Sequence, residues 1–126
     1  MNPTQGMVQA KAVTQELDNV LKLFDISKNN SVIITNGGRT YRVANVLKNR
    51  DDGSWMVTQL VSRGMFACDT CGNDVEPKYI PEDTWTQFTH GEDVVSMHSG
   101  LIHTFREHPE KISEETLNKV AKIFLG

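Results

Sequence analysis

Two runs of strand-forming residues meet at a glycine turn, and this arrangement limits the fold more than any other feature of the sequence. The first run, residues 31–35, reads Ser-Val-Ile-Ile-Thr, and the second covers residues 39–48. β-Branched side chains favour strands, and the Asn-Gly-Gly turn at residues 36–38 supplies residues that tolerate a positive φ. The sequence therefore predicts a β-hairpin.

A second turn, residues 49–53, leads into a third predicted strand over residues 54–62. In that strand Trp55 and every second residue after it share one face, and Met56 and every second residue after it share the other. Both faces carry large apolar groups. We therefore expect a small antiparallel β-meander that is either covered on both sides or curled into an SH3-like or OB-like barrel.

Helical periodicity predicts what flanks the meander. Between residues 8 and 24 apolar side chains recur at three- and four-residue steps, which is typical of a helix that packs on a core. Ser113 is a good N-cap for a last helix that ends near Gly126. The expected fold class is α+β, with one N-terminal helix and two to three C-terminal helices around the sheet.

The stretch between the meander and the last helix is predicted as a strand over residues 75–80 and then two helices. Pro81 and the acidic residues after it suit a first helical turn, and glycine at position 91 suits a helix end. The second helix is expected over residues 92–107, because the position before Pro109 disfavours the α region.

Length and composition are those of one globular domain. The chain has 126 residues, of which 38% are hydrophobic and 23% charged, so we expect a single domain over residues 7–126 after a disordered stretch at residues 1–6. No apolar run approaches a membrane span, and the first residues do not resemble a secretory signal. A soluble cytoplasmic protein is expected, and its small size without catalytic motifs suggests a bacterial or phage accessory protein.

Cys68 and Cys71, the two cysteines of the chain, form a C-x-x-C-G turn directly after a strand-like segment. Such a turn lets two thiolates approach one metal ion while the glycine permits a tight backbone, so it resembles a zinc knuckle in general form. A structural zinc site needs four ligands, and His90 is the predicted third ligand. The alternatives are two unmodified thiols and a thioredoxin-like redox motif, which the turn residues after Cys71 disfavour.

Three further histidines lie closer to the C-terminus. His98 and His103 have a spacing that zinc fingers use, but on one continuous helix side chains five positions apart differ by about 140° in direction. We therefore expect His98 in the core, and His103 and His108 at the surface.

The charges are distributed unevenly. Residues 28–63 contain six basic and two acidic side chains, whereas residues 64–126 contain eleven acidic and five basic ones. A partner that carries phosphates would meet the basic sheet, where aromatic rings could stack on bases. The predicted contact residues are Arg39, Tyr41, Arg42, Lys48, Arg50, Trp55 and Arg63.

Catalytic motifs are missing from the sequence: there is no G-x-S-x-G, no H-E-x-x-H and no phosphate-binding loop. The enzymatic hypothesis that survives is a metal hydrolase with Cys68, Cys71 and His90 as ligands and Glu92 as the base.

Three functions follow from these observations. The favoured one is a non-catalytic binding or regulatory protein, an adaptor or inhibitor that acts on a protein partner, with zinc holding the cysteine turn. The alternatives are a nucleic-acid-binding protein and the metal-dependent hydrolase. A homodimer is a further expectation, because a second copy could supply the missing metal ligands or pair with an exposed strand edge.

Overall fold

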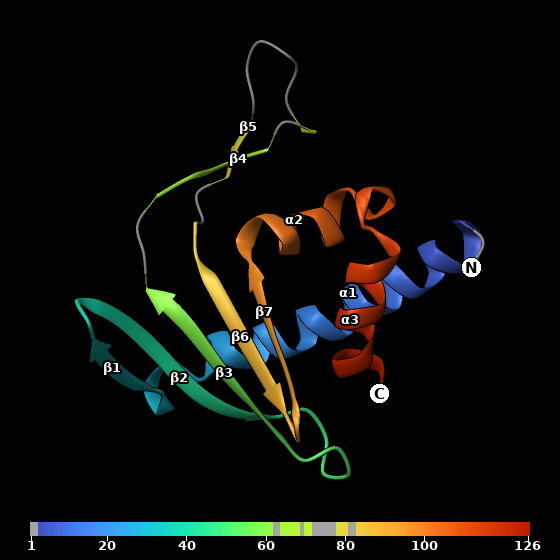
Figure 1. The fold of residues 1–126 in the computed structure, drawn as a ribbon. Coiled ribbons are helices and arrows are strands. Elements are labelled where there is room, and N and C mark those ends of the chain that lie inside the picture. The colour runs from blue at the N-terminus through green and yellow to red at the C-terminus, as the bar shows by residue number, and fades with distance from the viewer. Residues whose placement is uncertain (1–2, 62–63, 69, 72–77, 81–82) are drawn as a thin grey trace.

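The computed structural model describes residues 3–61, 64–68, 70–71, 78–80 and 83–126. Figure 1 shows their arrangement. The helices are α1 (Pro3–Ile26), α2 (Ser99–Glu107) and α3 (Glu114–Leu125), with short 3-10 helices η1 (Lys28–Asn30) and η2 (Pro109–Lys111). The strands are β1 (Val32–Asn36), β2 (Arg39–Leu47), β3 (Ser54–Val61), β4 (Phe66–Cys68), β5 (Lys78–Ile80), β6 (Trp85–His90) and β7 (Asp93–His98).

The predicted meander is present and forms most of the main sheet. Five antiparallel strands lie in the order β1-β2-β3-β6-β7, which follows the chain except that β4 and β5, between β3 and β6, form a separate ribbon. The turn between β1 and β2 has Gly37 at φ 61° and Gly38 at φ 77°, the two positive values that a type I′ turn requires. The α+β prediction is confirmed.

The closed barrel is not confirmed. Strands β1 and β7 stand at the two ends of the strand order, and no pairing joins them within the part of the chain that the structure describes. The sheet is open and its helices lie on one face, where α1 crosses the strands with α3 beside it near β7 (Figure 1).

The core lies between this sheet face and the helices. Trp55, Val57, Phe88 and Met97 point toward the helices and are almost fully buried. These side chains share the core with the apolar stripe that the sequence predicts on α1. The stripe consists of Val13, Leu17, Val20 and Phe24, each with no exposed surface. The stripe of the N-terminal helix is therefore core, as predicted, although the helix itself begins earlier, at Pro3.

The two helices predicted between residues 81 and 107 are wrong for the most part. Residues 85–98 form the β6–β7 hairpin, and only residues 99–107 are helical. In β6 and β7 buried and exposed side chains alternate, which is the period of a strand. Gly91 has φ 63° in a two-residue turn between paired His90 and Asp93, so this glycine serves a hairpin rather than a helix end.

A two-stranded ribbon stands apart from the main sheet. Strand β4 pairs with β5 antiparallel, from Phe66 with Ile80 to Cys68 with Lys78, and the ribbon lies next to α2 (Figure 1). Strand β5 coincides with the end of the strand predicted over residues 75–80; its predicted start lies outside the described residues, as does the turn predicted after Cys71.

The last helix begins as the sequence predicts. The Ser113 side chain accepts a hydrogen bond from the Thr116 backbone N–H at 3.2 Å, and Glu114 and Glu115 occupy the first turn. Of the helices that the structure describes, none has the length and apolar character needed to cross a membrane.

Candidate metal centre

Four side chains with metal-binding atoms converge between the ribbon and α2. They are Cys68, Cys71, His103 and His108, and one ligand atom from each lies within 4.8 Å of all the others. The Cys71 Sγ is 3.1 Å from the His103 Nε2 and 3.0 Å from the His108 Nε2. The Cys68 Sγ is 3.5 Å from the His108 Nε2. This is a complete Cys2His2 set from one chain.

The ribbon positions the two thiols. Cys68 is the last residue of β4 and is buried. Cys71 lies three positions further along the chain, in a turn. The Cys71 backbone N–H donates to the Cys68 Sγ at 3.4 Å. This contact fixes the position of Cys71 relative to the Cys68 sulfur.

The end of α2 positions the two histidines. His103 lies on α2, and His108 follows the last helical residue, with φ −137° and ψ 52° and its N–H bonded to the Thr104 carbonyl at 2.8 Å. On a continuous helix these two side chains would point about 140° apart. Because the backbone leaves the helix at His108, before Pro109, the two rings instead approach to 5.2 Å between centroids.

A close contact between Phe66 and Gly100 holds the ribbon against α2. A Cβ on Gly100 would lie 2.9 Å from the Phe66 ring, so a larger residue at this position would push β4 away. The Phe66 ring also makes T-shaped contacts with the rings of His98 and His103, with distances between ring centroids of 6.0 Å and 5.8 Å. Phe66 therefore positions one ligand histidine as well as the strand that carries Cys68.

The donor atoms fit a tetrahedral zinc ion. With Zn–S near 2.3 Å and Zn–N near 2.05 Å, sulfur and nitrogen ligands of a tetrahedron lie about 3.6 Å apart. The three S–N distances, 3.0 to 3.5 Å, are at or below this value, so small outward movements would admit the ion. Two soft thiolates with two imidazoles are typical ligands of zinc. The group could bind a metal, and four protein ligands would fill a tetrahedral site.

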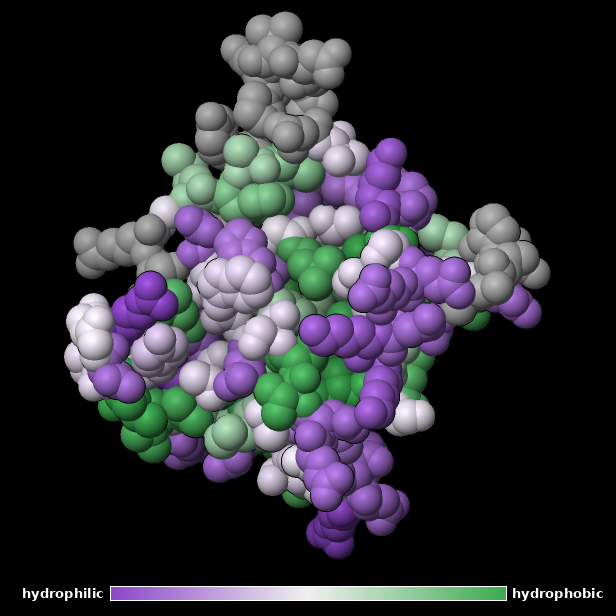
Figure 2. Space-filling model, in the orientation of Figure 1, coloured by the Kyte–Doolittle hydropathy of each residue, from purple (hydrophilic) through white to green (hydrophobic). Residues whose placement is uncertain are grey.

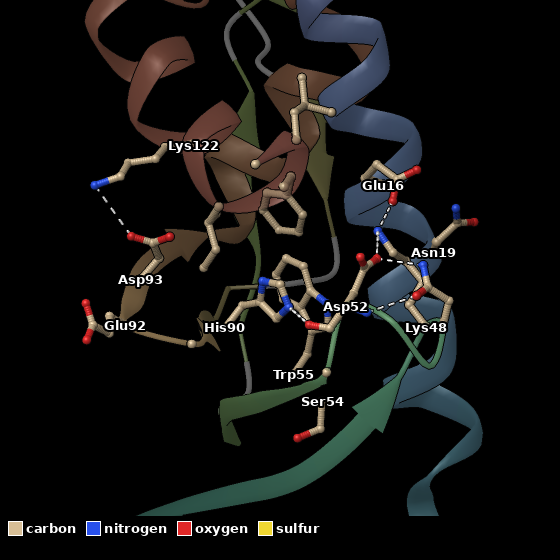
Figure 3. A pocket seen from close by; sticks show the side chains of 17 residues that line it. Glu16, Asn19, Lys48, Asp52, Ser54, Trp55, His90, Glu92, Asp93 and Lys122 are labelled. Carbon is tan, nitrogen blue, oxygen red and sulfur yellow. Dashed lines mark hydrogen bonds and ion pairs between the residues drawn. The ribbon is translucent and has the colours of Figure 1, made fainter.

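His90, the predicted third ligand, lies elsewhere. It is at the far end of β6 from the ribbon, where its ring stacks on Trp55 at 4.3 Å with planes 5° apart, and its Nε2 bonds the Asp52 carbonyl (Figures 1 and 3). Glu92, the predicted base, sits in the neighbouring hairpin turn. The structure therefore does not bring His90 and Glu92 to the two cysteines.

The sequence contained the signal for the two missed histidines. His103-x4-His108 has the same spacing as the pair His98-x4-His103 and follows the C-x-x-C turn. Pro109 marks the point where a helix must end, so His108 was free to turn back. The expectation that His103 and His108 lie at the surface is corrected: both are half-buried against the cysteines.

The described residues among those predicted to contact nucleic acid are not all at the surface. Trp55 is buried in the core, 1% exposed, so its ring cannot stack on a base. Lys48 bonds Glu16 and approaches Asp52 within 3.9 Å, as Figure 3 shows. These two positions serve the fold of the protein.

Arg42 is also held by its neighbours. Its guanidinium lies 3.6 Å from the centroid of the Phe24 ring and donates to the Phe24 carbonyl at 3.0 Å, with Asp25 4.0 Å away. Burial lowers the pKa of Arg42, and the charge of Asp25 opposes that shift. Arg39 and Arg50 are exposed and Tyr41 is half-buried, while Arg63 lies outside the described residues.

Comparisons with known proteins add no relative. No protein-family model, no curated protein and no solved structure gives a significant match to the chain.

Proposed function

We propose that this protein is a non-catalytic, protein-binding domain in which a structural zinc ion fastens the β4–β5 ribbon to α2. The observation that carries the proposal is the Cys2His2 group, in which Cys68, Cys71, His103 and His108 all come from one chain. A second copy is not needed to complete this coordination.

The number of ligands favours a structural role for the metal. Catalytic zinc sites keep three protein ligands and leave a fourth position for water or substrate, whereas structural sites have four protein ligands. Among the described residues, the group has four side chains and Glu92 is not near it. The hydrolase alternative would require one of these four ligands to leave.

The position of the group explains what the metal would do. Each side of the interface supplies two ligands, the ribbon through its thiols and the α2 end through its imidazoles. An ion bound to all four would cross-link the ribbon to the main domain. The small contact around Phe66 would then be reinforced by metal–ligand bonds.

Among the described elements, none covers the sheet face opposite the helices, and this uncovered face supports a role in protein binding. Opposite the helices, this face carries large apolar side chains that are about half exposed or slightly less, namely Leu47, Met56, Trp85 and Val94. Aromatic residues and methionine are enriched at protein interfaces, and Trp85 and Met56 are of these types. Acidic side chains predominate after residue 64, which disfavours a nucleic-acid partner there.

The first test addresses the metal. Protein purified without chelator should contain one zinc per chain by elemental mass spectrometry, with molar mass measured by light scattering on the same sample. Cobalt substituted for zinc should give the absorption bands of a tetrahedral thiolate–imidazole site. Added azide should leave those bands unchanged, because no exchangeable position exists.

Two variants and a control sharpen this test. Cys71→Ser and His103→Ala should each weaken metal binding, whereas His90→Ala should retain it in full. A cobalt spectrum that azide alters, or metal binding that depends on His90, would overturn the structural assignment and favour the hydrolase.

The second test addresses the partner. Affinity capture at moderate salt should recover a protein that binds the wild type and the exposed-residue control Arg50→Ser, but not Trp85→Ser. If every captured protein also binds Trp85→Ser, the uncovered sheet face is not the contact surface.

A further inference from the structure

Strand β1 is an edge strand of the main sheet. It stands at one end of the strand order, and all five of its residues are exposed. Val32, Ile33 and Ile34 have 60%, 59% and 45% of their surface exposed. An edge strand carries a row of backbone N–H and C=O groups that face outward, and here apolar side chains stand on both sides of that row.

Strand β1 lacks the features that usually prevent an edge strand from pairing with another chain. Natural edges carry a lysine, a proline, an inward charge or a covering element. Between Ser31 and Asn36 the chain has none of these residue types, and the described residues place no element beyond β1. Strand β7, at the opposite edge, begins with Asp93 and packs against α2 and α3.

The exposed apolar surface at β1 is visible as a separate patch. Figure 2 shows strongly hydrophobic residues at the lower left of the molecule, where Figure 1 places β1. By register, Val32 and Ile34 continue the uncovered sheet face beside Val43 and Tyr41, whereas Ile33 lies opposite Arg42 on the face that carries the helices. A strand added at this edge would cover side chains on both faces.

The charges around β1 indicate which kind of chain could pair with this edge strand. Lys28 precedes the strand in η1, and Arg39 pairs with Asn36 at its other end, so a basic side chain lies near each end. Within the described part of the chain neither forms an ion pair. Antiparallel pairing of two copies would bring Lys28 of one copy toward Arg39 of the other, and like charges disfavour that complex.

We propose that β1 binds an extended segment of a protein partner as a sixth strand, with alternating apolar side chains in the middle of the segment and acidic residues at both ends. Backbone hydrogen bonds would supply affinity, and the two basic ends would select the acidic flanks. The inference rests on the proposed protein-binding function and names the chemistry of the partner.

The test uses two synthetic peptides with the purified, metal-loaded protein. Both have alternating valine and threonine in the middle; one has two acidic residues at each end, and the other has two lysines instead. Fluorescence anisotropy of labelled peptide should show that the acidic peptide binds roughly tenfold more tightly at low salt, and that added salt reduces the difference. Hydrogen exchange should show slower exchange of β1 amides in the complex.

Matched variants locate the contact. Ile33→Ser should weaken binding of the acidic peptide roughly fivefold, because an exposed apolar group would lose its burial in the complex. Val8→Ser makes a similar change at an exposed position of α1, outside the sheet, and should leave binding unchanged. Since both side chains are already exposed, circular dichroism should show that both variants remain folded.

Each contrary result has a distinct meaning. Failure of the acidic peptide to bind, or equal binding of both peptides, overturns the proposal for β1. Light scattering that shows a dimer, converted to a monomer by Ile33→Ser, would assign the edge to a second copy instead. Partner capture that depends on Trp85 but not on Ile33 would leave the proposed function standing and overturn β1 as its site.

Discussion

Individual side chains in this protein have roles that their residue type alone does not indicate. Arg42, a basic residue on a basic sheet, holds the end of α1 by packing on Phe24 and bonding its carbonyl. The carbonyls of the last helical turn have no partner within a helix, so an arginine that reaches one of them stabilises that end. The same residue type at position 39 is exposed.

Replacing Arg42 should therefore destabilise the protein. We expect Arg42→Ala to lower the free energy of unfolding by about 1–2 kcal/mol, since one charge-assisted hydrogen bond and one cation–π contact are lost. Urea denaturation would measure it. Arg39→Ala, an exposed control, should change stability by less than about 0.5 kcal/mol. Equal effects of the two variants would show that the Phe24 contacts contribute nothing.

Gly100 is the residue on which the contact between ribbon and helix depends. In Gly100→Ala the new methyl group would meet the Phe66 ring at 2.9 Å, so β4 and Cys68 would move away from His103 and His108. Chelator competition should show metal binding about tenfold weaker, the lower end of the range for residues that support metal ligands. Unchanged metal affinity would mean that β4 shifts without moving its thiol.

At the scale of elements, the three hairpins of the main sheet each have a glycine with positive φ in the turn. The β6–β7 turn has Gly91 at φ 63°, a region that a side chain disfavours, while its turn neighbour Glu92 has no positive φ. This turn also sets the register that places Phe88 and Met97 in the core.

Gly91→Ala should thus destabilise the protein by about 1 kcal/mol, because alanine pays a steric penalty in the left-handed region. Thermal unfolding followed by circular dichroism would detect the change. Glu92→Ala, in the same turn, should be nearly neutral. A neutral Gly91→Ala would contradict the assigned turn geometry.

The ribbon and the main sheet should respond differently to loss of metal. The core around Trp55 and Phe88 is apolar and includes no metal ligand, whereas the ribbon is fastened by its thiols and Phe66. After chelation, hydrogen-exchange mass spectrometry should show faster exchange in β4 and at the end of α2, with β2 and β3 unchanged. Loss of protection throughout the sheet would mean that the metal is required for the whole fold.

On the scale of the whole molecule, one aromatic cluster joins the sheet to the last helix. Phe124 of α3 lies 5.1 Å from the Trp55 ring and 5.2 Å from the Phe88 ring, and Trp55 stacks on His90 on its other side. Residues from β3, β6 and α3 thus share one cluster, so we expect the sheet and the last helix to unfold together.

Phe124→Ala should remove about 3–5 kcal/mol of stability, the usual cost of a large buried cavity. Tryptophan fluorescence during urea denaturation would report it, since Trp55 contacts the site. Leu125→Ala changes the adjacent residue, which is 43% exposed, and should cost much less. If both variants were equally stable, α3 would not be part of the cooperative core.

Local sequence patterns correctly predicted those elements in which the spacing of apolar residues alone indicates which side is buried. The strands over residues 32–61 and the N-terminal helix followed from period-2 and period-3.6 patterns of apolar residues, and the cap at Ser113 followed from residue type. The same local rules were misleading at residues 85–98, because Trp85 and Phe88 are three apart and suit a helix, while their strand pairing depends on β3 and β7.

The metal ligands separate what the sequence by itself determined from what the tertiary structure decided. The two cysteines are three positions apart, so their pairing at one turn was readable from the chain alone. Their partners are more than thirty positions away, and His90 is nearer in sequence than His103 or His108. Only the packing of the ribbon on α2, with the helix ending at His108, brings those imidazoles to the thiols, because distance along the chain carries no information about distance across a folded interface.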